Sequence, residues 1–286
     1  MPSLLSDITS RLGSVSDIPA LDASVLLAHI TDKPRTWVLA HTELTLTPDQ
    51  QTALDDSITR LQCGEPLPYV LGKWEFFGME FEVTPDVLIP RPETERLVEK
   101  AISWLRQNPT RRNIVDVGTG SGAIAIALAA NFSDAKILAT DISPEALKVA
   151  KRNVEKHSAA NRIDFINCDL LPDLKASEAI VDIRPLRFDL ICANLPYIPT
   201  DTLHNLPIFN REPTLALDGG KGGLDQIQRL MKSAPEYLAP NAMMLLEIEA
   251  TLGRQAIELA EQHFPEADVQ LHQDLAGCDR LLEIQT

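Results

Sequence analysis

The sequence predicts an α/β protein in which a doubly wound parallel sheet follows a small all-helical domain and a linking β-hairpin. Three observations carry this prediction. Residues 1–72 place their apolar side chains at helical spacing, and residues 73–90 change to the alternation of a short hairpin. From residue 113 onward, short apolar runs alternate with longer amphipathic ones, as in repeated βα units of a parallel sheet covered on both faces.

Composition limits the class of protein. The 286 residues suit one large and one small domain, and 44% hydrophobic with 23% charged residues is typical of a chain with a packed core. A net charge of −15 repels phosphate, so we expect no direct binding to nucleic acid or to an anionic membrane.

The scattered cysteines and the lack of a recognisable targeting signal favour a cytoplasmic location. The four cysteines show no Cys-x-x-Cys pair, so neither a disulfide framework nor a metal site is expected, and Cys168 and Cys192 read as buried thiols. The N-terminus lacks the continuous hydrophobic stretch of a secretory signal, and the longest apolar run, residues 123–130, is too short to span a bilayer.

Residues 1–72 are expected to form a helical bundle. Helical spacing begins at Leu4, a second stretch begins at Asp22, and a third surrounds Val38. The fourth helix should start at Thr47, because Thr is a good N-cap and Pro48 suits the first helical position.

The hairpin of residues 73–90 should turn near Gly78. Pro90 and Pro92 then force extended backbone before a helix that opens the third domain, residues 91–286. Glu93 and Glu95 beside Arg91 form either a catalytic carboxylate pair or a loop held by ion pairs.

The third domain should contain seven strands and at least four helices. The strands are expected at 114–117, 136–140, 164–168, 188–193, 242–248, 269–272 and 280–284. The helices are expected at 123–130, 144–156, 224–238 and 252–260.

The turn after the first of these strands predicts a nucleotide-like cofactor. Its residues are Gly118, Thr119, Gly120, Ser121 and Gly122. Glycines let the backbone pass close to a ligand, and Asp141 at the end of the next strand can accept from ribose hydroxyls. The pattern fits NAD as well as S-adenosylmethionine. The alternative is a packing turn, with Asp141 capping the helix that begins at Pro144.

A second acid, Asp169, should follow the third strand. Its carboxylate could accept from an adenine amine while Leu170 packs on the ring. A solvated aspartate at the end of a strand is the plain alternative.

The run Asn194-Leu195-Pro196-Tyr197 should lie at the tip of a buried strand, where open α/β sheets bind their ligands. An amide oxygen there can hold an NH2 group while the tyrosine ring packs on the substrate. These four residues are therefore the candidate catalytic and substrate-binding residues, with Asn194 also facing the cofactor. A simple Asn-Pro turn is the alternative. Glu212-Pro213 and Asp218-Gly219-Gly220 then belong either to a lid or to ordinary turns.

The chain resembles the peptide chain release factor glutamine N5-methyltransferases. The resemblance rests on residues 64–72 (GEPLPYVLG), 89–95 (IPRPETE), the glycine turn, the 194–197 run and residues 277–280 (GCDR), and so covers nearly the whole chain. One departure is Leu195, where the family usually has proline. Asn-Leu-Pro-Tyr is also typical of rRNA adenine dimethyltransferases, which carry their helical domain after the catalytic one.

The resemblance implies a seven-stranded Rossmann-like methyltransferase domain that uses S-adenosylmethionine and yields S-adenosylhomocysteine. The implied acceptor is the glutamine of the Gly-Gly-Gln motif in class 1 peptide chain release factors, in support of translation termination, with residues 1–72 as the substrate-docking domain. The resemblance also implies that the Asn194 side chain and the Leu195 carbonyl accept the hydrogen bonds of the glutamine NH2 group. The alternatives are N6-adenine methylation of rRNA or DNA with the same site, a NAD-dependent oxidoreductase, and a catalytically silent adaptor.

Overall fold

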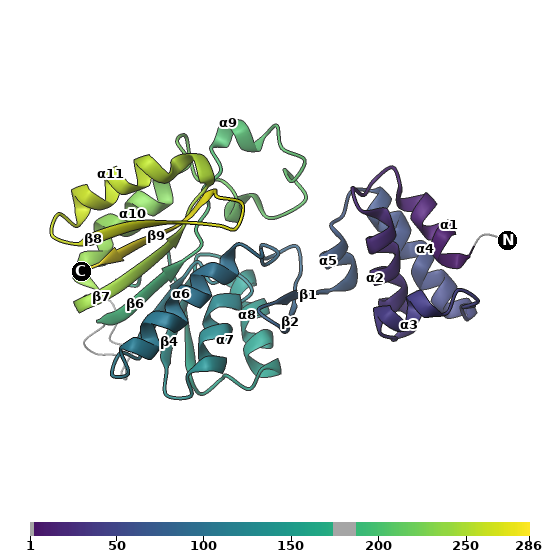
Figure 1. Cartoon of the computed structure of the whole chain (residues 1–286), viewed down its shortest axis with the longest axis horizontal. Coiled ribbons are helices and arrows are strands. Elements are labelled where there is room, and N and C mark those ends of the chain that lie inside the picture. Colours follow the sequence, from purple (N-terminus) through teal and green to yellow (C-terminus); the bar gives the residue numbers. More distant parts are fainter. Residues whose placement is uncertain (1–2, 174–186) are drawn as a thin grey trace. The chain divides into compact units, whose positions relative to one another are not determined.

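The computed structural model describes residues 3–173 and 187–286, which divide into two compact units, residues 1–73 and 74–286. Figure 1 labels most of the elements of both. Among the described residues, no helix is both long and apolar enough to cross a bilayer.

The first unit is a bundle of helices packed through their apolar faces. Its helices are α1 (Leu4–Leu12), α2 (Pro19–Thr31), α3 (Arg35–Ala40), α4 (Pro48–Gln62) and α5 (Leu67–Leu71). The prediction for Thr47 is confirmed, because Thr47 and Gln50 cap α4 reciprocally in a capping box. Ile8, Leu26 and Leu54 are fully buried, and they lie on α1, α2 and α4, which contact one another.

The hairpin consists of β1 (Lys73–Phe76) and β2 (Met79–Glu82). Phe77 and Gly78 have φ of 53° and 70°, as a two-residue hairpin turn requires. Phe76 and Phe81 are buried in the same core cluster as the helices of the second unit. The hairpin is also held by two hydrogen bonds between the Glu82 backbone and the Asn153 side chain, at 2.7 and 3.0 Å.

The second unit contains the doubly wound sheet that the sequence predicts, in the order β5-β4-β3-β6-β7-β9-β8. Its strands are β3 (Asn113–Val117), β4 (Lys136–Asp141), β5 (Ile163–Asn167), β6 (Phe188–Ala193), β7 (Leu238–Glu247), β8 (Asp268–Gln273) and β9 (Asp279–Gln285). β9 runs antiparallel to both of its neighbours, and the pairs from β5 to β7 are parallel. The strand order reverses at β3, which makes the carboxyl end of β3 the expected ligand site.

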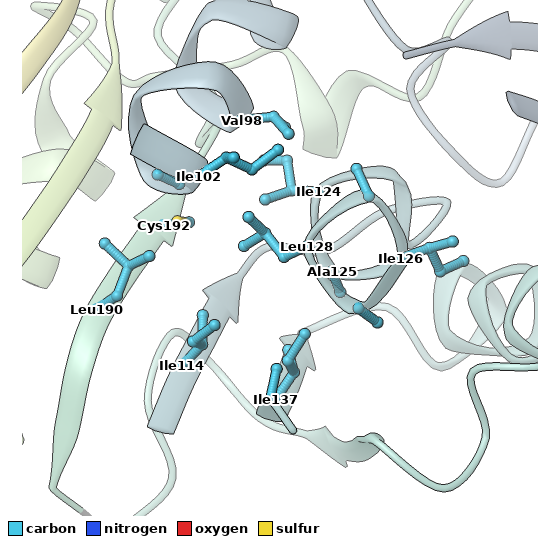
Figure 2. Close-up of a cluster of buried hydrophobic side chains, with 14 of the residues drawn as sticks. Val98, Ile102, Ile114, Ile124, Ala125, Ile126, Leu128, Ile137, Leu190 and Cys192 are labelled. Carbon is cyan, nitrogen blue, oxygen red and sulfur yellow. The ribbon is translucent and has the colours of Figure 1, made fainter. Parts of the chain in front are cut away.

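Two hydrophobic cores cover the sheet. The helices are α6 (Thr94–Gln107), α7 (Ala123–Asn131), α8 (Pro144–Lys156), α9 (Thr200–Leu203), α10 (Asp225–Ser233) and α11 (Gly253–His263), with α6 to α8 on one face and α10 and α11 on the other (Figure 1). Strand residues alternate between the cores: Leu190 and Cys192 face α6 and α7 (Figure 2), whereas Ile191 faces the opposite core.

Three local expectations were wrong. The third strand ends one residue earlier than expected, at Asn167, although Asp169 does follow it as expected. The helix expected at 224–238 stops at Ser233, because Pro235 cannot continue its hydrogen bonds, and β7 starts at Leu238. Cys192 is fully buried as expected, but Cys168 is only half-buried.

Candidate active site

A cavity of about 560 Å³ opens at the carboxyl ends of β3, β4 and β6, a size suited to a small organic ligand. Ten of the twelve candidate cofactor-binding, substrate-binding and catalytic residues line it: Gly118, Thr119, Gly120, Ser121, Asp141, Asp169, Leu170, Asn194, Leu195 and Pro196. Gly122 and Tyr197 are not among its lining residues.

The glycine turn uses left-handed backbone at each of its glycines, with φ of 71° at Gly118, 55° at Gly120 and 83° at Gly122. Gly122 serves packing rather than the cavity. A Cβ placed there would lie 3.2 Å from Ile126 Cδ1 and 3.4 Å from Ala150 Cβ, so its absence lets α7 and α8 approach. The packing interpretation therefore holds for Gly122, while the first four residues of the turn face the cavity.

A buried acid supports this turn from below. Asp116 is fully buried, and its Oδ2 accepts from Thr119 Oγ1 at 2.6 Å and from the Ala125 N–H at 3.2 Å. Its Oδ1 has no partner among the described residues. Burial raises the pKa of Asp116 to about 7, because an ionised carboxylate is poorly solvated there.

Asp141 combines both interpretations made from the sequence. It lines the cavity, and its two oxygens accept from the Gly120 and Ser143 N–H groups, each at 2.9 Å. It thus holds the glycine turn and also the turn before α8. Burial raises the pKa of its carboxyl group.

Asp169 faces the cavity as half of an ion pair. Its Oδ2 lies 2.5 Å from an Arg229 guanidinium nitrogen of α10, and Arg229 also lines the cavity. Leu170 beside it has φ of 62°, and its carbonyl accepts from Thr140 Oγ1 at 2.7 Å. Nothing in the sequence pairs Arg229 with an acid 60 residues earlier.

The tip of β6 presents two oxygens that receive no hydrogen bond from any described residue. Asn194 donates from Nδ2 to Thr94 Oγ1 at 2.9 Å, which leaves its Oδ1 unengaged. The Leu195 carbonyl is the second such oxygen, while the Leu195 side chain is buried. Both residues line the cavity.

Tyr197 lies behind the cavity instead of forming its wall. Its hydroxyl donates to Glu247 Oε1 at 3.0 Å, and Thr94 Oγ1 donates to Glu247 Oε2 at 2.6 Å. Glu247 ends β7 and is almost fully buried. Burial raises the pKa of Glu247, against the lowering effect of the two hydroxyl donors. The ring of Tyr197 is half-buried, and the expectation that it packs on a substrate stays a prediction.

The loops around the cavity are fixed by ordinary turn and ion-pair contacts. Glu212 accepts from the Ile89 N–H at 3.1 Å and pairs with Arg91 at 2.5 Å. Glu95 accepts from the Phe77 N–H at 2.8 Å, and neither Glu93 nor Glu95 is among the residues that line the cavity. Asp218 accepts from Thr200 Oγ1 at 2.6 Å, which closes the loop that follows Tyr197.

Sequence reasoning missed Thr94, Arg229 and Glu247. Glu247 carried a usable signal, because a lone acid at the end of the apolar run 242–248 must find partners when buried. Thr94 stood inside the 89–95 run without a role of its own.

Comparison with known proteins decides the family. Residues 3–72 match the PrmC N-terminal domain model, and residues 114–206 match a methyltransferase domain model. A release factor glutamine methyltransferase of Moorella thermoacetica is 40% identical over 264 residues, 92% of this chain and 89% of that protein. One from Rhodopirellula baltica is 34% identical over 285 residues, covering 98% and 93%. The chain belongs to the release factor glutamine methyltransferase family. The resemblance seen in the sequence is thereby confirmed, with the expected enzyme class.

Solved structures agree on the fold. The catalytic domain of human Mettl16, in complex with the MAT2A 3′UTR hairpin 6, superposes with a TM-score of 0.54 at 17% identity, covering 84% of this chain and 83% of that one. At this identity the likeness concerns the Rossmann-like fold alone. In this member of the release factor glutamine methyltransferase family, the cavity thus lies at the carboxyl ends of a Rossmann-like sheet.

Proposed function

We propose that this protein transfers a methyl group from S-adenosylmethionine to the side-chain amide nitrogen of the glutamine in the Gly-Gly-Gln motif of class 1 peptide chain release factors. The observation that carries the proposal is the pair of unengaged oxygens, Asn194 Oδ1 and the Leu195 carbonyl, beside the glycine turn. Family membership supports the acceptor class.

The cavity fits S-adenosylmethionine in its donor set and its volume. Gly118 to Ser121 offer backbone for close approach, Asp141 retains lone pairs for ribose hydroxyls, and Asp169 with Leu170 suits the adenine. When bound, the cofactor supplies a methyl group activated by its sulfonium sulfur.

The two oxygens suit an amide nitrogen, which is a poor nucleophile because its lone pair is delocalised into the carbonyl. Asn194 Oδ1 and the Leu195 carbonyl would each accept one N–H of the glutamine, fix the nitrogen toward the methyl group and stabilise the positive charge that develops on it. No strong base would be required before transfer, because the nitrogen, once methylated and positively charged, would lose one proton to water. Tyr197 would pack against the glutamine side chain while its hydroxyl donates to Glu247 at 3.0 Å.

We propose further that residues 1–72 dock the release factor and that the reaction takes place in the cytoplasm. The net charge of −15 argues against direct nucleic-acid binding.

Mass spectrometry of a class 1 release factor after incubation with the protein and S-adenosylmethionine tests the proposal. We expect one added methyl group on the Gly-Gly-Gln peptide. Label from the methyl donor entering rRNA or DNA instead would replace the proposal with N6-adenine methylation. Calorimetric titration with S-adenosylhomocysteine and with NAD separates the two methyltransferase functions from an oxidoreductase, because a methyltransferase should bind the first ligand and an oxidoreductase the second.

A further inference from the structure

We propose that Thr94 and Glu247 are positioning residues that fix the orientation of the Asn194 carboxamide, so that its oxygen and not its NH2 group faces the cavity. This inference rests on the proposed function, because only the oxygen can accept from a substrate NH2. Neither residue needs to touch the substrate; both act through Asn194.

The geometry is a continuous chain of hydrogen bonds. Asn194 Nδ2 lies 2.9 Å from Thr94 Oγ1, and Thr94 Oγ1 lies 2.6 Å from Glu247 Oε2. Tyr197 closes the other side of the carboxylate at 3.0 Å from Oε1. Thr94 and Glu247 are 5% and 3% exposed, so water does not compete for these contacts.

The direction of every bond follows from the carboxylate. An ionised glutamate has no proton, so it accepts from both Thr94 and Tyr197. The Thr94 hydroxyl has one hydrogen, which is committed to Glu247, and it can therefore only accept from Asn194. Asn194 must then turn its NH2 group to Thr94, which leaves Oδ1 on the cavity side.

Protonation of Glu247 would release the Asn194 carboxamide from this fixed orientation. A carboxylic acid can donate its proton to Thr94 Oγ1, and the Thr94 hydroxyl is then free to donate to the Asn194 oxygen. The charged or titratable groups that act on Glu247 are Tyr197 on the β6 turn, Glu93 before α6 and Arg280 on β9. Since burial raises the pKa of Glu247, turnover of the wild-type protein should fall as pH decreases through that raised value. The Glu247→Gln variant should turn over slowly at every pH, and its turnover should not fall further as pH decreases.

The main test compares Thr94→Val with Thr94→Ser on a release factor that the wild type methylates. Valine keeps the shape but cannot relay a hydrogen bond, so kcat should fall roughly ten- to a hundredfold, as expected for a displaced catalytic group. Serine retains the hydroxyl and should restore most of the turnover. Affinity for S-adenosylhomocysteine should stay within a few-fold in both. Ser233→Ala is the control for loss of a hydroxyl outside the site, because Ser233 is half-buried in the second unit and donates only to the Arg229 and Leu230 carbonyls of its own helix.

A double-mutant cycle with Asn194→Ala separates positioning from a direct role. If Thr94 acts through Asn194, Thr94→Val has no further effect on kcat once Asn194 is alanine. An undiminished effect in that background, or wild-type kcat for Thr94→Val alone, overturns the inference while leaving the proposed function intact. A wild-type protein that adds no methyl group to the release factor overturns both. Unfolding midpoints check each variant, and Thr94→Ala replaces Thr94→Val if valine prevents folding.

Discussion

The turns after β3 and β6 meet at one cavity but are built in opposite ways. The β3 turn offers backbone, shaped by glycines with positive φ and by the buried Asp116 beneath it. The β6 turn offers the Asn194 carboxamide, whose orientation depends on a hydrogen-bond chain that reaches Glu247. The first turn is suited to enclose a ligand, and the second to control the direction of one hydrogen bond. Mutations should therefore affect binding at the first and turnover at the second.

Asn194→Ala should produce the largest effect and the cleanest separation of the two turns. Removing one preorganised acceptor costs about 2.7–4 kcal/mol of transition-state stabilisation, or roughly a hundredfold or more in rate. Affinity for S-adenosylhomocysteine should change by no more than a few-fold, because the β3 turn is untouched. Steady-state kinetics and calorimetry measure the two quantities. Asn131→Ala serves as the control, because Asn131 is exposed. An unchanged kcat in Asn194→Ala would refute the role of the β6 turn.

Asp116 should make the stability of the β3 turn depend on pH. Its pKa in the folded protein, about 7, lies above the ordinary value of 3.8, so its stabilising contribution is complete below 3.8 and is lost as pH rises through about 7. Between pH 8 and pH 5.5 the wild type should gain about 2 kcal/mol in the free energy of unfolding relative to Asp116→Asn. Urea denaturation of both proteins at the two pH values measures the difference. Equal pH dependence in both would show that Asp116 is ionised in the fold.

Gly118→Ala and Gly120→Ala should show the smallest effects and reveal where the two turns touch. Each alanine costs about 1–2 kcal/mol because of its positive φ. A Cβ at Gly118 would also lie 3.0 Å from Leu195 Cδ2, whereas a Cβ at Gly120 meets nothing within 4 Å. Only Gly118→Ala should therefore displace Leu195 and lower kcat. Equal kcat in the two variants would count against this coupling between the turns.

The sequence was sufficient for what local patterns determine. The apolar run 188–193 predicted β6 and placed Asn194 at its tip, and Thr47 predicted the start of α4. The glycine turn and Asp141 were assigned to the cavity for the same reason, since strand ends of a parallel sheet converge.

The contacts that no pattern predicted join residues far apart in the chain. Thr94 is 100 residues from Asn194 and 153 from Glu247, so only the assembled sheet brings them together. Tyr197 was expected to face a substrate because of its position in the run. In the fold, the buried Glu247 needs donors, and the tyrosine hydroxyl is one of the two that reach it.

The insertion of β9 between β7 and β8 has a consequence for synthesis. Glu247 at the end of β7 pairs with Leu281 of β9, which is translated more than thirty residues later. Until residues 279–285 leave the ribosome, β7 has no partner on this side and remains an edge strand. The glycine turn after β3 can therefore form before β9 is made, whereas the edge of β7 that carries Glu247 is covered only when β9 joins the sheet.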